Sequence, residues 1–171
     1  MKLSDSCTIN ADIGAVWSAL LSAEVLKECV PGCQEMTGSP EEGFEAVVVQ
    51  KVGPVKATFK GAVQLLDQNP PLSVTIDGAG KGGAAGFAKG AANVRLEAEG
   101  DSTILHYDVD AKVGGKLAQL GSRIIDGFAK KMADEFFTRF QNALEEPEEN
   151  EEQAEAENET AGKGWFKRLV S

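Results

Sequence analysis

The spacing of apolar residues predicts how this chain begins. Residues 1–10 alternate between apolar and polar positions as a strand does, and over residues 12–22 apolar residues recur at helical spacing. A second short helix is predicted over Ala23–Cys29, because proline disfavours helical geometry in the residue before it and Pro31 follows closely. We therefore expect one strand and two short helices before the chain turns.

Alternating runs fill the middle of the chain, from residue 32 to residue 114. Turn signals such as Gly53-Pro54 and Asn69-Pro70-Pro71 separate these runs, which is typical of antiparallel neighbours. Alternation is clearest over residues 55–65, where Phe59 and Val63 share one face. The pattern predicts an antiparallel sheet with one covered face.

The hydrophobic period lengthens after Gly114-Gly115. Residues 116–144 contain no proline, and their apolar positions form a continuous stripe, as in a helix that packs on a sheet. The stripe comprises Leu117, Leu120, Ile124, Phe128, Met132, Phe136, Phe140 and Leu144. Helices segregated to one face of a run of strands predict an α+β domain over residues 1–144, in which the helices lie on one face of a curved antiparallel sheet.

Acidic residues are concentrated near the C-terminal end of the chain. The net charge is −10, and nine glutamates with no lysine or arginine lie between residues 145 and 159. Such a segment cannot bury apolar surface, so residues 145–161 are expected to form an acidic disordered linker. The remaining body is nearly neutral and lacks the clustered cations of a nucleic-acid site, so no nucleic-acid partner is expected.

A basic, aromatic tail follows at residues 162–171. Its composition suits the interface of an anionic bilayer, although docking on a protein groove remains an alternative. The residues expected to contact a membrane or partner are Trp165, Phe166, Lys167, Arg168 and Leu169. No apolar run approaches the roughly 20 residues needed to cross a bilayer, and no signal peptide is evident. We expect a cytoplasmic protein with peripheral contact to the cytoplasmic membrane face.

Small residues at inward positions of the sheet, such as Ala57, Gly61 and Ala92, leave space beneath the long helix. The helix could fill that space, or it could be an apolar ligand cavity of the kind that binds small molecules. The candidate ligand-binding residues are Trp17, Phe59, Val63, Val74, Ile76, Tyr107, Ile124 and Phe128, with Phe87 at the rim. The sequence leaves both interpretations open.

Catalytic chemistry has little support. His106 is the only histidine, and strand alternation turns it away from the covered face. Cys29 and Cys33 have no further Cys pair or His cluster to complete a zinc site. We therefore expect a non-catalytic protein without a metal or covalent cofactor.

Three segments occur in order along the chain: Cys29-Val-Pro-Gly-Cys33, Val52-Gly-Pro-Val-Lys-Ala-Thr-Phe-Lys-Gly61 and Leu117-Ala-Gln-Leu-Gly-Ser-Arg-Ile-Ile-Asp126. With them the chain resembles the family of the carbon-monoxide dehydrogenase CoxG subunit, in the SRPBCC or START-like superfamily. The resemblance implies a helix-grip fold, in which a curved antiparallel sheet is wrapped around a long C-terminal helix and commonly encloses an apolar ligand pocket. It also implies an accessory protein of a molybdenum-containing carbon-monoxide dehydrogenase or related hydroxylase.

Three classes of function follow. The leading hypothesis is a binding module that holds a hydrophobic molecule, such as a lipid or a respiratory quinone, while its tail makes transient contact with the membrane. The alternative is an assembly or docking factor with a filled core and no ligand. A START-like enzyme is the third class, and the outward position of His106 disfavours it.

Overall fold

One antiparallel sheet dominates the fold. The computed structural model describes residues 1–157, with side chains described through residue 145. The strands of the sheet are β1 (Lys2–Ile9), β2 (Cys33–Ser39), β3 (Gly43–Val52), β4 (Val55–Asn69), β5 (Ser73–Lys81), β6 (Phe87–Glu99) and β7 (Ser102–Gly114). Their order across the sheet is β1-β7-β6-β5-β4-β3-β2, and every neighbouring pair is antiparallel. This confirms the α+β fold predicted from the alternating runs.

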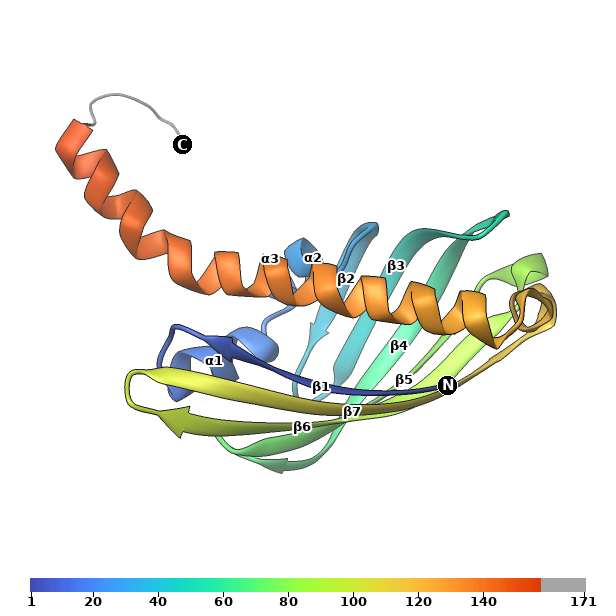
Figure 1. Cartoon of the computed structure of the whole chain (residues 1–171), viewed down its shortest axis with the longest axis horizontal. Coiled ribbons are helices and arrows are strands. Elements are labelled where there is room, and N and C mark those ends of the chain that lie inside the picture. The colour runs from blue at the N-terminus through green and yellow to red at the C-terminus, as the bar shows by residue number, and fades with distance from the viewer. Residues whose placement is uncertain (158–171) are drawn as a thin grey trace.

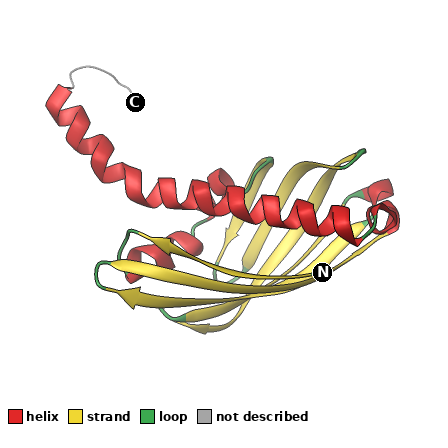
Figure 2. Ribbon diagram, in the orientation of Figure 1, coloured by secondary structure: helices red, strands yellow, loops and turns green. Residues whose placement is uncertain are grey.

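The helices lie on one side of this sheet (Figures 1 and 2). α1 (Ile13–Leu20) and α2 (Ala23–Cys29) connect β1 to β2 at one end, and each is capped by a side chain. Asp12 accepts a hydrogen bond from the Gly14 amide at 2.9 Å, and Ser22 accepts one from the Val25 amide at 3.3 Å. These contacts satisfy amides that have no partner within the helix. α2 begins at the predicted residue, whereas α1 begins one residue later than predicted.

The long helix begins later than expected. A short 3₁₀ helix, η2 (Gly115–Leu120), comes first, and α3 (Ser122–Glu157) follows it. Gly121 separates the two with a φ of +92°, a conformation that a residue with a side chain rarely adopts. The single helix predicted from residue 116 is therefore broken at Gly121, and α3 crosses the concave face of the sheet from that point (Figure 1).

The end of α3 also differs from expectation. We expected the helix to stop at residue 144 and an extended linker to follow, whereas α3 continues to Glu157. Glutamate, glutamine and alanine have high intrinsic helix propensity, and in this segment they form helix despite the run of like charges. The last residues of the expected linker, 158–161, and the whole tail lie outside the described residues.

The core lies at the α1 end of the sheet. Ile9, Val16, Leu105 and Phe140 are fully buried there, in a cluster that joins β1, α1, β7 and α3. Because the buried cluster occupies one end of the sheet, the concave face beyond it is left to the first half of α3 and to the space beneath that helix.

Candidate functional site

An apolar cavity of about 350 Å³ lies between the concave face of the sheet and α3. Strand alternation supplies its floor, because residues on one face of neighbouring strands stand side by side. The floor consists of Val63, Leu65, Ile76, Ala92, Val94, Leu105, Tyr107 and Val109. Of these positions, the sequence predicts Val63, Ile76, Ala92 and Tyr107 on the covered face.

The roof and one end of the cavity come from the helices and from the chain around β2. α3 contributes Met132, Ala133, Phe136 and Phe137. The end nearest α2 consists of Leu20, Leu26, Val30, Pro31, Met36 and Phe44. Sequence reasoning missed this end, because tertiary packing rather than a local period brings its helix, loop and strand side chains together.

Polar contacts hold α3 at the margins of the sheet. Gln141 donates a hydrogen bond from Nε2 to the Thr8 carbonyl of β1 at 2.8 Å, and Glu145 accepts one from the Asn10 amide at 2.9 Å. The helix packs mainly on β1 and α2 and has few contacts with the central strands. Held between β1 at one edge of the sheet and α2, which packs on β2 at the other edge, α3 roofs the small residues of the central strands without filling the space above them.

Three of the candidate residues line this cavity together: Val63 on β4, Ile76 on β5 and Tyr107 on β7. Trp17 on α1 and Val74 on β5 are buried in the cluster, but they are not among the residues that line the cavity. The structure therefore places these two residues in the core rather than at the cavity.

The other candidates lie away from the cavity. The Phe59 ring packs over Gly82, and Ile124 is 42% exposed beside Gly53. Phe128 is half-buried but does not contribute to the lining. None of the three is among the residues that line the cavity.

The predicted position of Phe87 at the cavity rim is wrong. It lies on β6 with the same parity as Lys89 and Ala91, which face the convex side of the sheet, and its ring covers Gly114 there. Phe87 is 44% exposed on that surface. It therefore lies on the opposite side of the sheet from the cavity and cannot form its rim.

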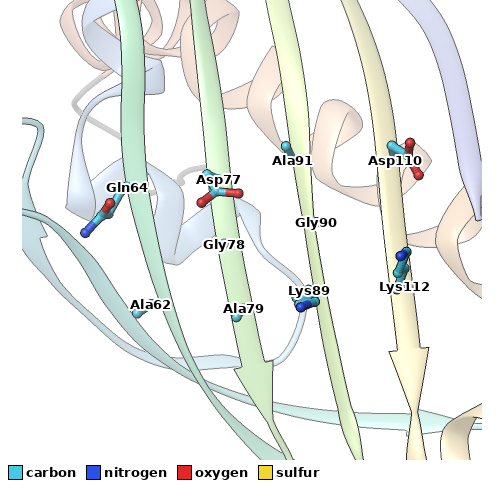
Figure 3. A pocket seen from close by; sticks show the side chains of 10 residues that line it. All are labelled: Ala62, Gln64, Asp77, Gly78, Ala79, Lys89, Gly90, Ala91, Asp110 and Lys112. Carbon is cyan, nitrogen blue, oxygen red and sulfur yellow. The ribbon is translucent and has the colours of Figure 1, made fainter.

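A second hollow, of about 620 Å³, lies on the convex face (Figure 3). Its floor is made of small residues, including Gly78 and Gly90, and charged side chains of β5, β6 and β7 surround it. Lys89 stands directly opposite Lys112 on the neighbouring strand, and Asp110 lies one row away. Charged side chains of both signs around an open depression are typical of a solvated sheet surface, so the concave cavity is the better candidate for an apolar ligand.

Three groups in and around the buried cluster favour their neutral forms. Burial raises the pKa of Tyr107, and the carboxylate of Asp5 raises it further. Burial also raises the pKa of Cys7 to about 11 and that of Cys29 to about 11. Thiols of this kind are mostly protonated near neutral pH and are poor nucleophiles.

His106 lies on the convex face, as predicted. Its Nε2 is 3.1 Å from Glu97 Oε1, and it is not among the residues that line the cavity. Among the residues with described side chains, no group of three or more His, Cys, Asp or Glu could hold a metal ion. Within residues 1–157, no helix is long and apolar enough to span a membrane.

Comparison with known proteins identifies relatives of this domain. The family model described as the CoxG subunit of carbon monoxide dehydrogenase matches residues 6–145. The search of curated proteins gave no match. A conserved protein from Geobacillus kaustophilus has a similar solved structure, with 27% identity, coverage of 84% of this chain and 95% of that one, and a TM-score of 0.78.

More distant solved structures share the fold. Protein TTHA0849 from Thermus thermophilus is 11% identical, with coverage of 84% of this chain and 97% of that one, and has a TM-score of 0.63. Protein CV1439 from Chromobacterium violaceum is 11% identical with the same coverage, 84% and 97%, and a TM-score of 0.61. At this identity the likeness shows the fold alone.

Proposed function

The chain belongs to the CoxG family, named for a subunit of carbon monoxide dehydrogenase, and we propose that it is a non-catalytic accessory protein that binds a hydrophobic molecule for a carbon monoxide dehydrogenase-like enzyme. The class of molecule that we propose is a lipid-soluble ring compound such as a respiratory quinone. We propose a molybdenum-containing dehydrogenase or a related hydroxylase as the partner, because the family is named for a subunit of carbon monoxide dehydrogenase.

The observation that carries this proposal is the apolar cavity beneath α3. Its volume of about 350 Å³ suits the ring system of a small molecule. Moving roughly 200 Å² of apolar ligand surface out of water would contribute about 5 kcal/mol, against which the loss of ligand freedom must be set. A ring head group therefore gains enough from this cavity to bind, and a longer apolar chain would extend out of it.

The cavity also favours binding over the rival hypothesis. A docking factor with a filled core would have aromatic side chains of α3 inserted between the helix and the sheet. Phe136 and Phe137 instead line the cavity wall, and the floor beneath them includes Ala92. The space is thus a feature that the docking hypothesis does not require.

A membrane is the natural source of such a molecule. Trp165, Phe166, Lys167, Arg168 and Leu169 supply the aromatic and cationic groups that an anionic membrane interface attracts. We propose that this tail, which lies outside the described residues, makes peripheral contact with the cytoplasmic membrane face. Binding and membrane contact would then be two parts of one function, the transfer of an apolar molecule between the bilayer and the enzyme.

Native mass spectrometry of the full chain, purified gently from its own host, tests the binding proposal. We expect a mass above that of the polypeptide, and organic extraction should release the bound molecule for identification. A clean polypeptide mass, together with no binding of added quinone, would contradict the carrier function and favour the docking factor.

A further inference from the structure

Lysine side chains gather at one end of the convex face of the sheet. They form three pairs whose members lie directly opposite each other on neighbouring strands: Lys51 and Lys56, Lys60 and Lys81, and Lys89 and Lys112. All six are exposed, and they span the strands from β3 to β7 at the end of the sheet where α3 begins. We call these six residues the lysine patch.

The lysine patch is electrostatically unfavourable for an isolated domain. Like charges directly opposite each other on neighbouring strands repel and destabilise a sheet. Among the residues with described side chains, no carboxylate forms a salt bridge with any of the six amino groups. The lysines are spread over residues 51–112, so only the register of the sheet brings them together. Six unneutralised cations in a chain of net charge −10 point to an anionic partner.

The shape of the surface suits a helix. Every described helix lies on the other face of the sheet, so the patch is uncovered by residues 1–157 (Figures 1 and 2). The hollow that includes Lys89 and Lys112 has a floor of small residues, among them Ala62, Ala79 and Gly90 (Figure 3). Such a floor lets a helix approach the strands closely, so carboxylates on that helix can reach the lysines.

The chain itself contains a helix of the required chemistry. Residues 145–157 continue α3 and belong to the segment with nine glutamates and no lysine or arginine between residues 145 and 159. We call residues 145–157 the acidic helix. Its length is about 20 Å at 1.5 Å per residue, and the four strand spacings from β3 to β7 add up to about 19 Å. The acidic helix therefore matches the lysine patch in length as well as in charge.

The acidic helix cannot reach the lysine patch of its own chain. It begins at Glu145, which accepts a hydrogen bond from the amide of Asn10, just beyond the end of β1. That end of β1 pairs with Thr103, which lies about 30 Å along β7 from Lys112. The acidic helix also extends past the edge of the sheet on the side opposite the patch (Figure 1). Only a second copy of the chain can place this helix on the patch.

We propose that the acidic helix of one copy of this chain binds the lysine patch of a second copy. The contact joins different surfaces of the two copies, so it can repeat from copy to copy. Its attraction is mainly between exposed charges, so salt weakens it. This inference goes beyond the proposed binding function and does not depend on it.

A bilayer fits the lysine patch less well than an acidic helix does. Phe87 lies directly opposite Lys81, and its ring covers Gly114 on the neighbouring strand. A ring held against the sheet does not project into a membrane interface. The patch also lies on the opposite face of the sheet from the apolar cavity, so a membrane bound there could not exchange a ligand with the cavity directly.

Analytical ultracentrifugation of the full chain at different salt concentrations is the first test. At about 50 mM NaCl we expect a mass above that of one chain, and at about 500 mM an association constant at least about tenfold lower, because salt screens exposed charges. A single-chain mass at low salt, or an association that salt leaves unchanged, would overturn the proposal. This measurement needs no variant.

Two charge-swapped variants of the full chain test the contact itself. The patch variant carries Lys60→Glu, Lys81→Glu, Lys89→Glu and Lys112→Glu, which keeps the members of each pair alike in charge. The segment variant carries Glu148→Lys, Glu149→Lys, Glu151→Lys and Glu152→Lys. Each variant alone should sediment as a single chain, because its patch and its acidic helix now repel each other. A mixture of the two should associate, because the altered patch of one attracts the altered helix of the other.

A matched control changes the net charge by the same amount as the patch variant does. It carries Lys27→Glu, Arg95→Glu, Arg123→Glu and Lys131→Glu, at exposed positions outside the lysine patch. This control should associate as the wild type does, and thermal unfolding of each variant checks that it is folded. If the patch variant still associates with itself, or if the mixture stays as single chains, the proposal is wrong. If the patch variant loses binding to phosphatidylglycerol vesicles while its self-association is unchanged, the patch is a membrane surface instead.

Discussion

Neighbouring aromatic residues of α3 have different surroundings at the scale of single residues. Phe140 is fully buried, and its ring stacks on Phe136 with centroids 5.6 Å apart. Phe128, three turns earlier on the same stripe, is only half-buried. Residues of one continuous apolar stripe therefore contribute unequally to the stability of the fold, and the periodicity of the stripe does not show which of them contribute most.

Replacing these two phenylalanines should show that difference. Phe140→Ala leaves a cavity in the buried cluster and should lower the free energy of unfolding by about 3–5 kcal/mol. Phe128→Ala, the matched control on the same helix, should cost clearly less, since its ring keeps part of its surface in water. Urea denaturation of both variants measures the two changes, and equal losses would show that Phe128 is core packing after all.

At the scale of elements, the cavity depends on small residues in the central strands. Ala92 is part of the floor on β6, between Ile76 of β5 and Val109 of β7 in the register. α3 cannot move closer to this floor, because its contacts with β1 and α2 fix its height. Side-chain size on the central strands therefore decides whether the space stays open.

Ala92→Leu should close part of that space. The added methyl groups enter a void, so the stability of the domain should stay within about 1 kcal/mol of the wild type, unlike the usual cost of overpacking a full core. Binding of 2-methyl-1,4-naphthoquinone, measured by calorimetric titration, should weaken by at least about tenfold, because leucine occupies ligand volume. Undiminished binding would place the ligand elsewhere, and strong destabilisation would show that no void exists there.

The sequence predicted the elements better than it predicted their surroundings. Strand alternation and the helical stripe were sufficient for the sheet, for α3 as the covering element and for the lining positions of Val63, Ile76 and Tyr107. They could not separate Trp17 from the lining, since a period shows that a residue is inward but not which element covers it. The Leu26 and Pro31 contacts were missed for the same reason.

The whole molecule has segmental charge. Nine glutamates follow the domain between residues 145 and 159, and three cations lie beyond them among aromatic and aliphatic residues. The first part of this acidic segment continues α3, which extends past the edge of the sheet (Figure 1). The acidic segment therefore lies between a nearly neutral domain and the basic end of the chain. Because an anionic membrane repels the acidic segment, only the basic end is suited to approach an anionic surface.

Membrane contact through this end should be weak and salt-dependent. Half-burying Trp165, Phe166, Leu169 and Val170 would contribute about 4–6 kcal/mol, and each of three cations near anionic lipid would contribute about 1 kcal/mol. Ordering some eight residues at roughly 1 kcal/mol each offsets most of that. Sedimentation with vesicles should therefore show binding of the full chain to anionic lipid that falls as salt rises, with little binding to neutral lipid.

Two variants separate the apolar and electrostatic contributions. Replacing Trp165 and Phe166 together by alanine should remove most binding at any salt concentration, whereas Lys167→Gln with Arg168→Gln should remove chiefly its dependence on salt and on anionic lipid. Deleting residues 162–171 should abolish vesicle binding and leave the thermal unfolding of the domain unchanged. If the deletion leaves vesicle binding intact but ends association with the dehydrogenase, the tail contacts the enzyme, and the docking hypothesis accounts for it better than the membrane does.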